Sequence, residues 1–244
     1  MLVLSLQYTY NYLNIIILIY RSPLKLVDLS DSSSGIKEYE IGKGKPPQTE
    51  DNRINKIFNS NEMLTSTYKK HIQGNDVSKY QLDWKGGYLN YGEWIAAPRE
   101  QKYFEGERII IREIPSKNRL ICAFTEEDFT VKNTAHIFKM NKEYHCKFIV
   151  ALLNSKLMGY YFVNKFSERD NVFPKAKLGQ CRLLPIKNTH LPDQQPFIDK
   201  VSEILTLKKA NPQADTLVLE AAIDTMVYEL YGLNDDEIKI VENS

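Results

Sequence analysis

The chain has 244 residues, of which 43% are hydrophobic and 26% are charged, and its formal net charge is +1. This composition is ordinary for a globular protein, and the chain is long enough to bury a sizeable core. We therefore expect one large domain or two small domains. The charge is uneven, because residues 199–244 hold 4 Lys/Arg and 10 Asp/Glu whereas residues 1–198 hold 28 and 21. The basic body is compatible with a nucleic-acid partner and equally with a mild excess of charge that has no function.

The three cysteines exclude two further classes of protein. Cys122, Cys146 and Cys181 lie far apart and form no CxxC pair, so neither a disulfide framework nor a zinc ribbon is indicated. His145 precedes Cys146 directly, without the spacing or further ligands that a metal site needs. We therefore predict no metal site, and a protein of the reducing cytoplasm.

The first twenty residues contain no charged side chain, which raises the question of a membrane span. Polar and apolar residues alternate from Leu4 to Tyr12, as in a half-buried strand, and no basic segment or cleavage site of a signal peptide is present. We predict a strand or an irregular segment here, which includes the boundary of a truncated gene product, and consider a membrane anchor the less favoured alternative. The cluster "DLSDSSSG" (28–35) then reads as a linker, so residues 1–34 form an N-terminal segment and linker.

The rest of the chain divides into a β-rich part and a helical part. Four short runs with turns between them predict a mostly antiparallel sheet, at residues 86–94, 107–114, 119–124 and 134–140. Apolar residues then recur at three- and four-residue spacings and predict helices at 146–166, 194–209 and 214–231, the last ending at Gly232, with a short helix after it. The predicted fold class is α+β, with one domain at 35–190 and a C-terminal helical segment at 191–244.

Motifs for catalysis are missing from the sequence. It contains no GxxxxGK[ST] loop, no GxGxxG, no HExxH and no GxSxG. A metal-dependent nuclease would need converging carboxylates and a lysine, for which Glu113, Asp128 and the "DEIK" at 236–239 are the only candidates that we find. We predict no catalytic residue and a chain that is catalytically silent alone, with a nuclease centre as a remote alternative.

Two basic segments are candidates for phosphate contact. In "EIGKGKPP" (40–47) the two prolines forbid a helix directly behind the glycines, so the segment is not an NTPase loop, but Lys43 and Lys45 can meet phosphates or lie in a solvated turn. Residues 165–187 hold six basic and two acidic side chains. Pro174 and Gly179 predict that this segment is an exposed loop.

The stretch "YGEWIAAPREQKYFEGERIIIREI" (91–114) gives a third candidate. Its last strand places Arg108 and Arg112 on one face, and a group of tyrosines and tryptophans precedes them. Arginine forks onto guanine or phosphate, and aromatic rings offer flat surfaces beside it. The alternative is that the aromatic rings belong to the core and the arginines pair with neighbouring glutamates.

Several blocks, in this order, resemble one known family: "EYEIGKGKPPQT", "GNDVSKYQLDWKGGYLNYGEWIAAPREQKYFEGERIIIREI", "LLNSKLMGYYF", "FPKAKLGQCRLLPI", "QQPFIDKVSEIL" and "VYELYGLNDDEIKIVE". Over roughly residues 35–242 they are similar to the TaqI-like C-terminal specificity domain. That domain is the target-recognition part of type II adenine-N6 DNA methyltransferases and of the fused type IIG restriction-modification enzymes.

The resemblance implies a module that binds double-stranded DNA and reads bases in the major groove. In the family a separate methylase domain binds S-adenosylmethionine, flips out the adenine and carries an Asn-Pro-Pro-Tyr motif. That motif is missing here, so we expect no cofactor in this chain and a methyltransferase domain or subunit as partner, with the C-terminal helices as its candidate contact. The residues predicted to contact DNA are Lys43, Lys45, Lys85, Arg99, Lys102, Arg108, Arg112, Lys175, Lys177 and Arg182. An alternative is a protein-interaction subunit of a restriction-modification or phage-defence complex without its own DNA readout.

Overall fold

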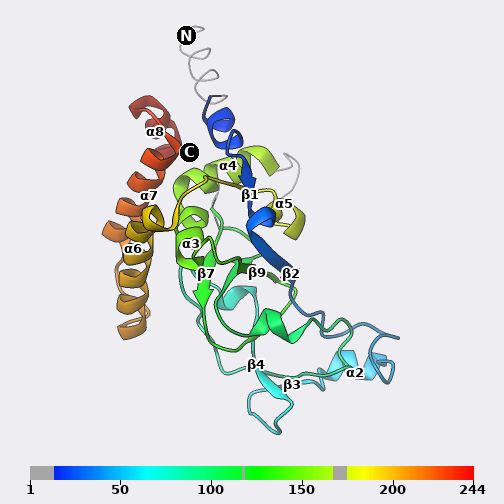
Figure 1. Cartoon of the computed structure of the whole chain (residues 1–244). Helices are drawn as coiled ribbons and strands as arrows, with labels where there is room; N and C mark the ends of the chain where they lie inside the picture. The colour runs from blue at the N-terminus through cyan, green and yellow to red at the C-terminus, as the bar shows by residue number, and fades with distance from the viewer. Residues whose placement is uncertain (1–13, 117–118, 167–174) are drawn as a thin grey trace. The chain divides into compact units, whose positions relative to one another are not determined.

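The computed structural model describes residues 14–116, 119–166 and 175–244, which form two compact units interleaved along the chain (Figure 1). The sheet unit comprises residues 31–114 and 122–139, and the described residues of the helical unit are 14–30, 115–116, 119–121, 140–166 and 175–244. The consecutive boundaries predicted after residues 34 and 190 stay predictions.

The sheet unit contains two four-stranded sheets, and most of their strand pairs are antiparallel. One sheet has the order β2-β9-β6-β7, and β6 pairs antiparallel with both β7 and β9. The other has the order β3-β5-β4-β8, in which β4 and β8 are parallel. The strands are β2 (Ser30–Ser34), β3 (Asn59–Ser60), β4 (Tyr68–Ile72), β5 (Tyr88–Asn90), β6 (Arg108–Arg112), β7 (Cys122–Thr125), β8 (Thr130–Val131) and β9 (Ala135–Met140). Short helices connect them, namely α2 (Glu50–Asn55), η2 (Gly74–Asp76) and η3 (Gln101–Phe104).

Strand β6 is the centre of the first sheet. Ile109, Ile110 and Ile111 are all fully buried, so both faces of this strand are covered. Three consecutive β-branched residues suit such a strand, because they pack well on a pleated surface. The predicted antiparallel sheet and the α+β class are confirmed.

The helical unit is built around two consecutive helices where the sequence predicts one. Helix α3 (Cys146–Asn154) ends at Ser155, whose backbone is extended, and α4 (Lys156–Phe166) begins directly after it. The carboxylate of Asp224 accepts a hydrogen bond of 2.8 Å from the Lys156 N–H and so caps α4. The prediction of one helix over 146–166 is therefore wrong at Ser155, because an acceptor distant in sequence satisfies a new helix start.

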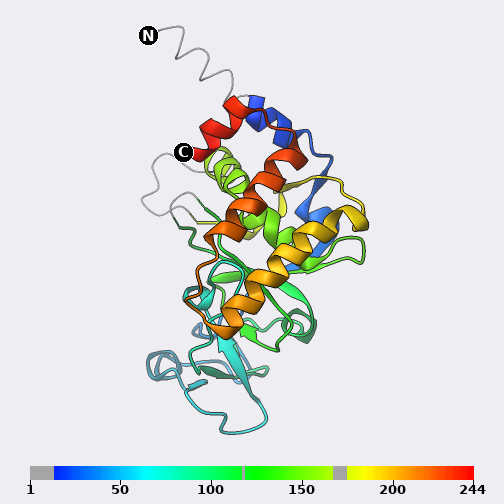
Figure 2. The ribbon, with the colours of Figure 1, turned by 90° about the vertical axis from the view of Figure 1, so that its left-hand side faces the viewer.

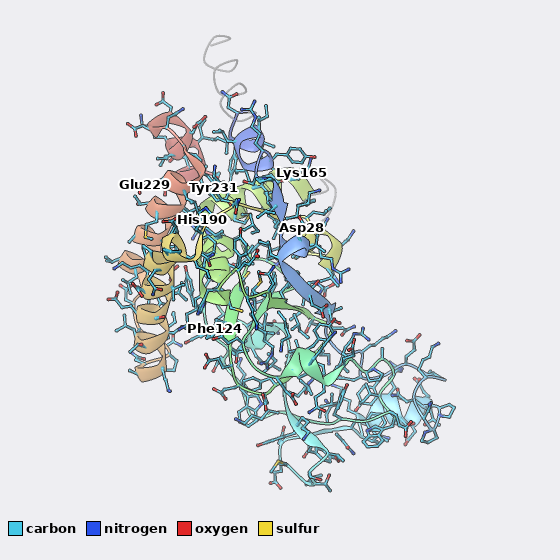
Figure 3. The ribbon with its side chains drawn as sticks, in the orientation of Figure 1. Asp28, Phe124, Lys165, His190, Glu229 and Tyr231 are labelled. Atoms are coloured by element: carbon cyan, nitrogen blue, oxygen red, sulfur yellow. The ribbon has the colours of Figure 1, made fainter. Side chains whose placement is uncertain are left out.

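Helices α6, α7 and α8 pack around α3 and α4 within this unit (Figures 1 and 2). Helix α3 contacts α6, α6 contacts α7, and α4 contacts both α7 and α8. Tyr231, labelled in Figure 3, donates a hydrogen bond of 3.0 Å to the Pro185 carbonyl and so ties α7 to β10. The elements are β1 (Leu24–Lys25), η1 (Leu26–Leu29), α5 (Leu178–Arg182), β10 (Pro185–Ile186), α6 (Leu191–Ala210), α7 (Leu217–Tyr231) and α8 (Asp235–Glu242), and β1 pairs with β10.

The N-terminal prediction is partly outside the described residues. Residues 14–20 are helical, with Ile15 and Ile19 fully buried, so the predicted strand or irregular segment is wrong for this stretch. The alternating stretch before it lies outside the described residues. Among the helices that the structure describes, none has the length and apolar character to cross a membrane.

Candidate nucleic-acid interface

Arg108 is a structural residue. Its side chain is fully buried at the start of β6, and its guanidinium donates hydrogen bonds to the carbonyls of Gly106, at 2.7 Å, and Glu127. Burial lowers the pKa of Arg108 to about 10, because the charged form loses hydration. Burial therefore argues against the predicted DNA contact of Arg108, because the strand pattern places the arginine on β6 but does not show whether its side chain is covered.

Arg112, at the other end of β6, is half-buried. Its guanidinium forms no hydrogen bond or ion pair with any residue that the structure describes. An arginine in this state keeps its five donors for a ligand. Arg112 thus stays a predicted contact.

Arg99 and Lys102 are engaged within the sheet unit. The Arg99 guanidinium donates to the carbonyls of Ser34 at 3.0 Å, Ala97 at 3.2 Å and Pro98 at 3.0 Å, which fixes the turn before η3. Lys102 Nζ lies 2.9 Å from Asp31 and 3.3 Å from Glu100, and these bonds raise the pKa of Lys102. A DNA contact from either residue would have to share or replace these partners.

The Gly-Lys loop at residues 40–47 is held in a defined conformation. The buried amide of Gln48 donates to the carbonyls of Glu38, at 2.9 Å, and Trp94, at 2.7 Å, and accepts from the Glu40 N–H. A Cβ at Gly44 would lie 2.2 Å from the Trp94 carbonyl oxygen, so only glycine fits there.

Lys43 and Lys45 are both exposed on this loop. Lys45 Nζ lies 3.7 Å from Glu93, and both of these side chains are largely in solvent, so the pair is weak. The two lysines therefore project from a fixed backbone and can exchange their solvent contacts for phosphates.

A polar groove of about 520 Å³ lies in the sheet unit. Of its lining residues, the sequence singles out only Lys85, as a DNA contact, and Tyr88, as one of the aromatic residues before β6. Amide, hydroxyl and charged side chains from α2, β3, β4 and the loop before β5 line it. The lining residues are Glu38, Asn55, Lys56, Asn59, Ser60, Asn61, His71, Gln73, Asp76, Lys85, Gly87, Tyr88 and Lys132.

The floor of the groove is a closed network of charges. The Glu38 carboxylate lies 2.7 Å from His71 Nε2 and 2.8 Å from Lys132 Nζ, and His71 Nδ1 lies 2.9 Å from the Thr130 hydroxyl. Burial alone would raise the pKa of Glu38, but its bonds to His71 and Lys132 outweigh burial and lower that pKa to about 2. The carboxylate is therefore ionised and fully partnered, and it fixes β4 against β8.

Lys56 and Lys85 are the exposed cations of the groove. Neither forms a hydrogen bond or ion pair with another residue of the described part of the chain. Lys56 ends α2 in the left-handed conformation, with φ 47°, which costs a non-glycine residue about 1 kcal/mol or more. Strain of this kind is typical of functional positions.

The aromatic residues of the predicted surface are mostly used in packing. Tyr80 is buried, and the indole N–H groups of Trp84 and Trp94 donate 2.8 Å bonds to the carbonyls of Gly87 and Asn90. The structure thus favours the alternative in which these rings stabilise the unit. Tyr88, which lines the groove, packs edge-on against Trp84 with 5.2 Å between ring centroids.

The basic residues predicted at 165–187 belong to the helical unit. Lys175 and Lys177 are exposed and Arg182 is half-buried. Residues 178–182 form α5, with Cys181 buried, so the predicted exposed loop is wrong for this part. Residues 167–174 of that prediction lie outside the described residues.

Residues 69–186 match the family model of the TaqI-like C-terminal specificity domain. The predicted resemblance is confirmed for this segment. No match is found among the curated proteins.

Solved structures share the fold at low sequence identity. The type IIL restriction-modification enzyme MmeI, in complex with DNA, is 12% identical with a TM-score of 0.59, over 90% of this chain and 35% of that one. The type IIG restriction endonuclease BpuSI is 12% identical with a TM-score of 0.50, over 91% of this chain and 33% of that one. This chain thus spans about a third of the length of either enzyme, and the likeness shows the fold alone.

Proposed function

We propose that the chain is the DNA target-recognition part of a restriction-modification enzyme of the type II or type IIG adenine-methyltransferase class. It would grip duplex DNA and select the site, and a separate methylase domain or subunit would bind S-adenosylmethionine and transfer the methyl group. The observation that carries this proposal is the match of residues 69–186 to the specificity-domain family. MmeI, a type IIL restriction-modification enzyme, and BpuSI, a type IIG restriction endonuclease, support it through the shared fold.

The division of labour has a physical basis. Extruding a base from the duplex costs a few kcal/mol, so the enzyme needs a firm grip at a fixed register while chemistry takes place. Phosphate contacts supply grip and register, and base-edge contacts supply selection. A module for this task needs cations on a stiff support, and the sheet unit offers both.

The cations best suited to phosphate contact are those that internal bonds leave available. In the sheet unit they include Lys43, Lys45, Lys56, Lys85 and Arg112. Lys175, Lys177 and Arg182 remain proposed contacts of the helical unit, whereas Arg99 and Lys102 contribute less because they already have partners. We add Lys56, which the sequence did not predict, to the proposed contacts and leave out the buried Arg108.

Salt dependence of duplex binding tests this proposal. About five phosphate contacts give a slope of roughly −4.5 in log affinity against log salt, which is a loss of about 500-fold between about 50 and 200 mM salt. The double variant Lys43→Ala, Lys45→Ala should weaken binding to all sequences alike and reduce the slope by about two.

A matched control is Lys239→Ala, because Lys239 is exposed on the acidic helix α8 and lies 3.0 Å from Asp236. We expect this variant to bind DNA as the unchanged chain does. Affinity that stays constant as salt rises, or equal losses in the control and the double variant, would contradict the proposal.

A further inference from the structure

We propose that the polar groove of the sheet unit reads base edges, and that Asn61 and Gln73 are its adenine-selecting residues. This inference rests on the proposed function and deepens it by assigning specificity. Both side chains are exposed and line the groove. A side-chain amide presents one donor and one acceptor, which matches the N7 acceptor and N6 donor of adenine in the major groove.

The other two groove amides are already committed. Asn55 donates a 2.6 Å bond to Asp51, and Asn59 accepts a 2.7 Å bond from the Tyr39 hydroxyl and lies 3.4 Å from Glu38. Asn61, in contrast, forms no hydrogen bond with any described residue. Its amide is therefore free to pair with a base without breaking an internal bond.

Both proposed readers are held by rigid elements. Asn61 follows β3, which pairs with β5, and Gln73 follows β4, which pairs with β5 and β8. The backbone N–H of Gln73 donates a 2.9 Å bond to the buried carboxylate of Asp76, which fixes its position at the start of η2. Side chains on strand ends are placed more accurately than those on long loops, and selective hydrogen bonding requires such accuracy.

The charges of the groove suit a duplex. The floor carboxylate of Glu38 is paired with His71 and Lys132, so it does not repel phosphate as a free carboxylate would. Lys56 and Lys85 are exposed cations without an internal partner among the described residues, and we assign them to phosphates beside the bases that are read. The groove thus combines cations for position with amides for selection.

Selection from a pool of randomised duplexes tests this inference with the full chain. The unchanged chain should enrich a motif that contains at least one A·T pair. Asn61→Ala and Gln73→Ala should each relax the preference at one such position by about 5- to 150-fold, the value of one good bidentate contact, and keep the rest of the motif. Lys56→Ala with Lys85→Ala should lower affinity for all sequences and keep the motif.

Asn75→Ala is the matched control. Asn75 is an exposed amide in η2, between Gly74 and Asp76, but it does not line the groove. This variant should keep both motif and affinity, and thermal unfolding should show that all variants fold. Binding without any sequence preference, or an unchanged motif in both groove variants, would overturn the inference. If the chain binds no duplex at all, the proposed function is contradicted as well. Binding without sequence preference would contradict only the inference about Asn61 and Gln73, so the two outcomes are distinguishable.

Discussion

Replacement of Arg108 separates a structural arginine from a DNA-binding one. Arg108→Met removes the guanidinium and fills part of its volume with an apolar side chain. The variant loses two hydrogen bonds to the carbonyls of Gly106 and Glu127, whereas the third contact, 3.5 Å from the Phe129 carbonyl, is too long to count. We therefore expect a lower free energy of unfolding and an unchanged affinity of the folded protein for DNA.

The magnitude follows from two opposing effects. Two hydrogen bonds from a charged donor contribute about 3–6 kcal/mol. Burial lowers the pKa of Arg108 from 12.5 to about 10, so removing the buried charge returns about 3 kcal/mol. The midpoint of the net loss is about 1.5 kcal/mol, which lowers the melting temperature by about 3–6 °C for a chain of this size.

Thermal unfolding followed by circular dichroism, with duplex binding measured well below the transition, checks this prediction. Arg108→Lys is the companion variant, because it keeps the charge but offers one donor group in place of a fork. It should lose stability as well and bind DNA normally. An Arg108→Met protein with an unchanged melting temperature and weakened DNA binding would refute the structural role.

Two further predictions concern the groove floor and the Gly-Lys loop. The pKa of Glu38 is about 2 in the folded protein against an ordinary 4.5, so its stabilisation is complete above about pH 4.5 and is lost as the pH falls towards 2. Glu38→Gln should remove up to about 3 kcal/mol at neutral pH and make acid unfolding between about pH 4.5 and 2 less steep, whereas equal acid sensitivity would show that the pairing is unimportant. Gly44→Ala should disturb the loop and weaken DNA binding more than Gly42→Ala, because both glycines have positive φ but only the Gly44 Cβ would meet backbone, 2.2 Å from a carbonyl oxygen. Equal affinities of the two variants would argue against a role for the loop.

The sequence predicts the positions of the strands better than the burial and the partners of their charged residues. The run Ile109–Ile111 identifies β6 from β-branching alone, since local propensity and burial agree there. Periodicity cannot show that Arg108 is covered, because the segment that accepts its hydrogen bond, at the Glu127 carbonyl, lies 19 positions away in the sequence. The sequence does not predict the helix break at Ser155 for the same reason. The break depends on Asp224, which caps the new helix at Lys156 and lies 68 positions away in the sequence.

The groove is the part of the candidate site that is hardest to predict from the sequence. Glu38 pairs with His71, 33 positions away, and with Lys132, 94 positions away. No local sequence motif can therefore predict the charge network at the floor of the groove. The one local signal is the polar run "NSNEMLTST" (59–67), which the structure places at the end of β3 beside the groove. Lys85 lies in one of the sequence blocks that carry the family resemblance, whereas Lys56 lies between those blocks.

The most direct test of the central claim is the affinity of the full chain for a selected duplex compared with a scrambled duplex of the same composition, at one fixed salt concentration. A specific module typically favours its site by a factor of about 10³ or more. Our account predicts a clear preference for the selected duplex that Asn61→Ala or Gln73→Ala reduces. Equal affinity for both duplexes, or no measurable binding to either, would contradict it and favour a protein-interaction subunit without its own DNA readout.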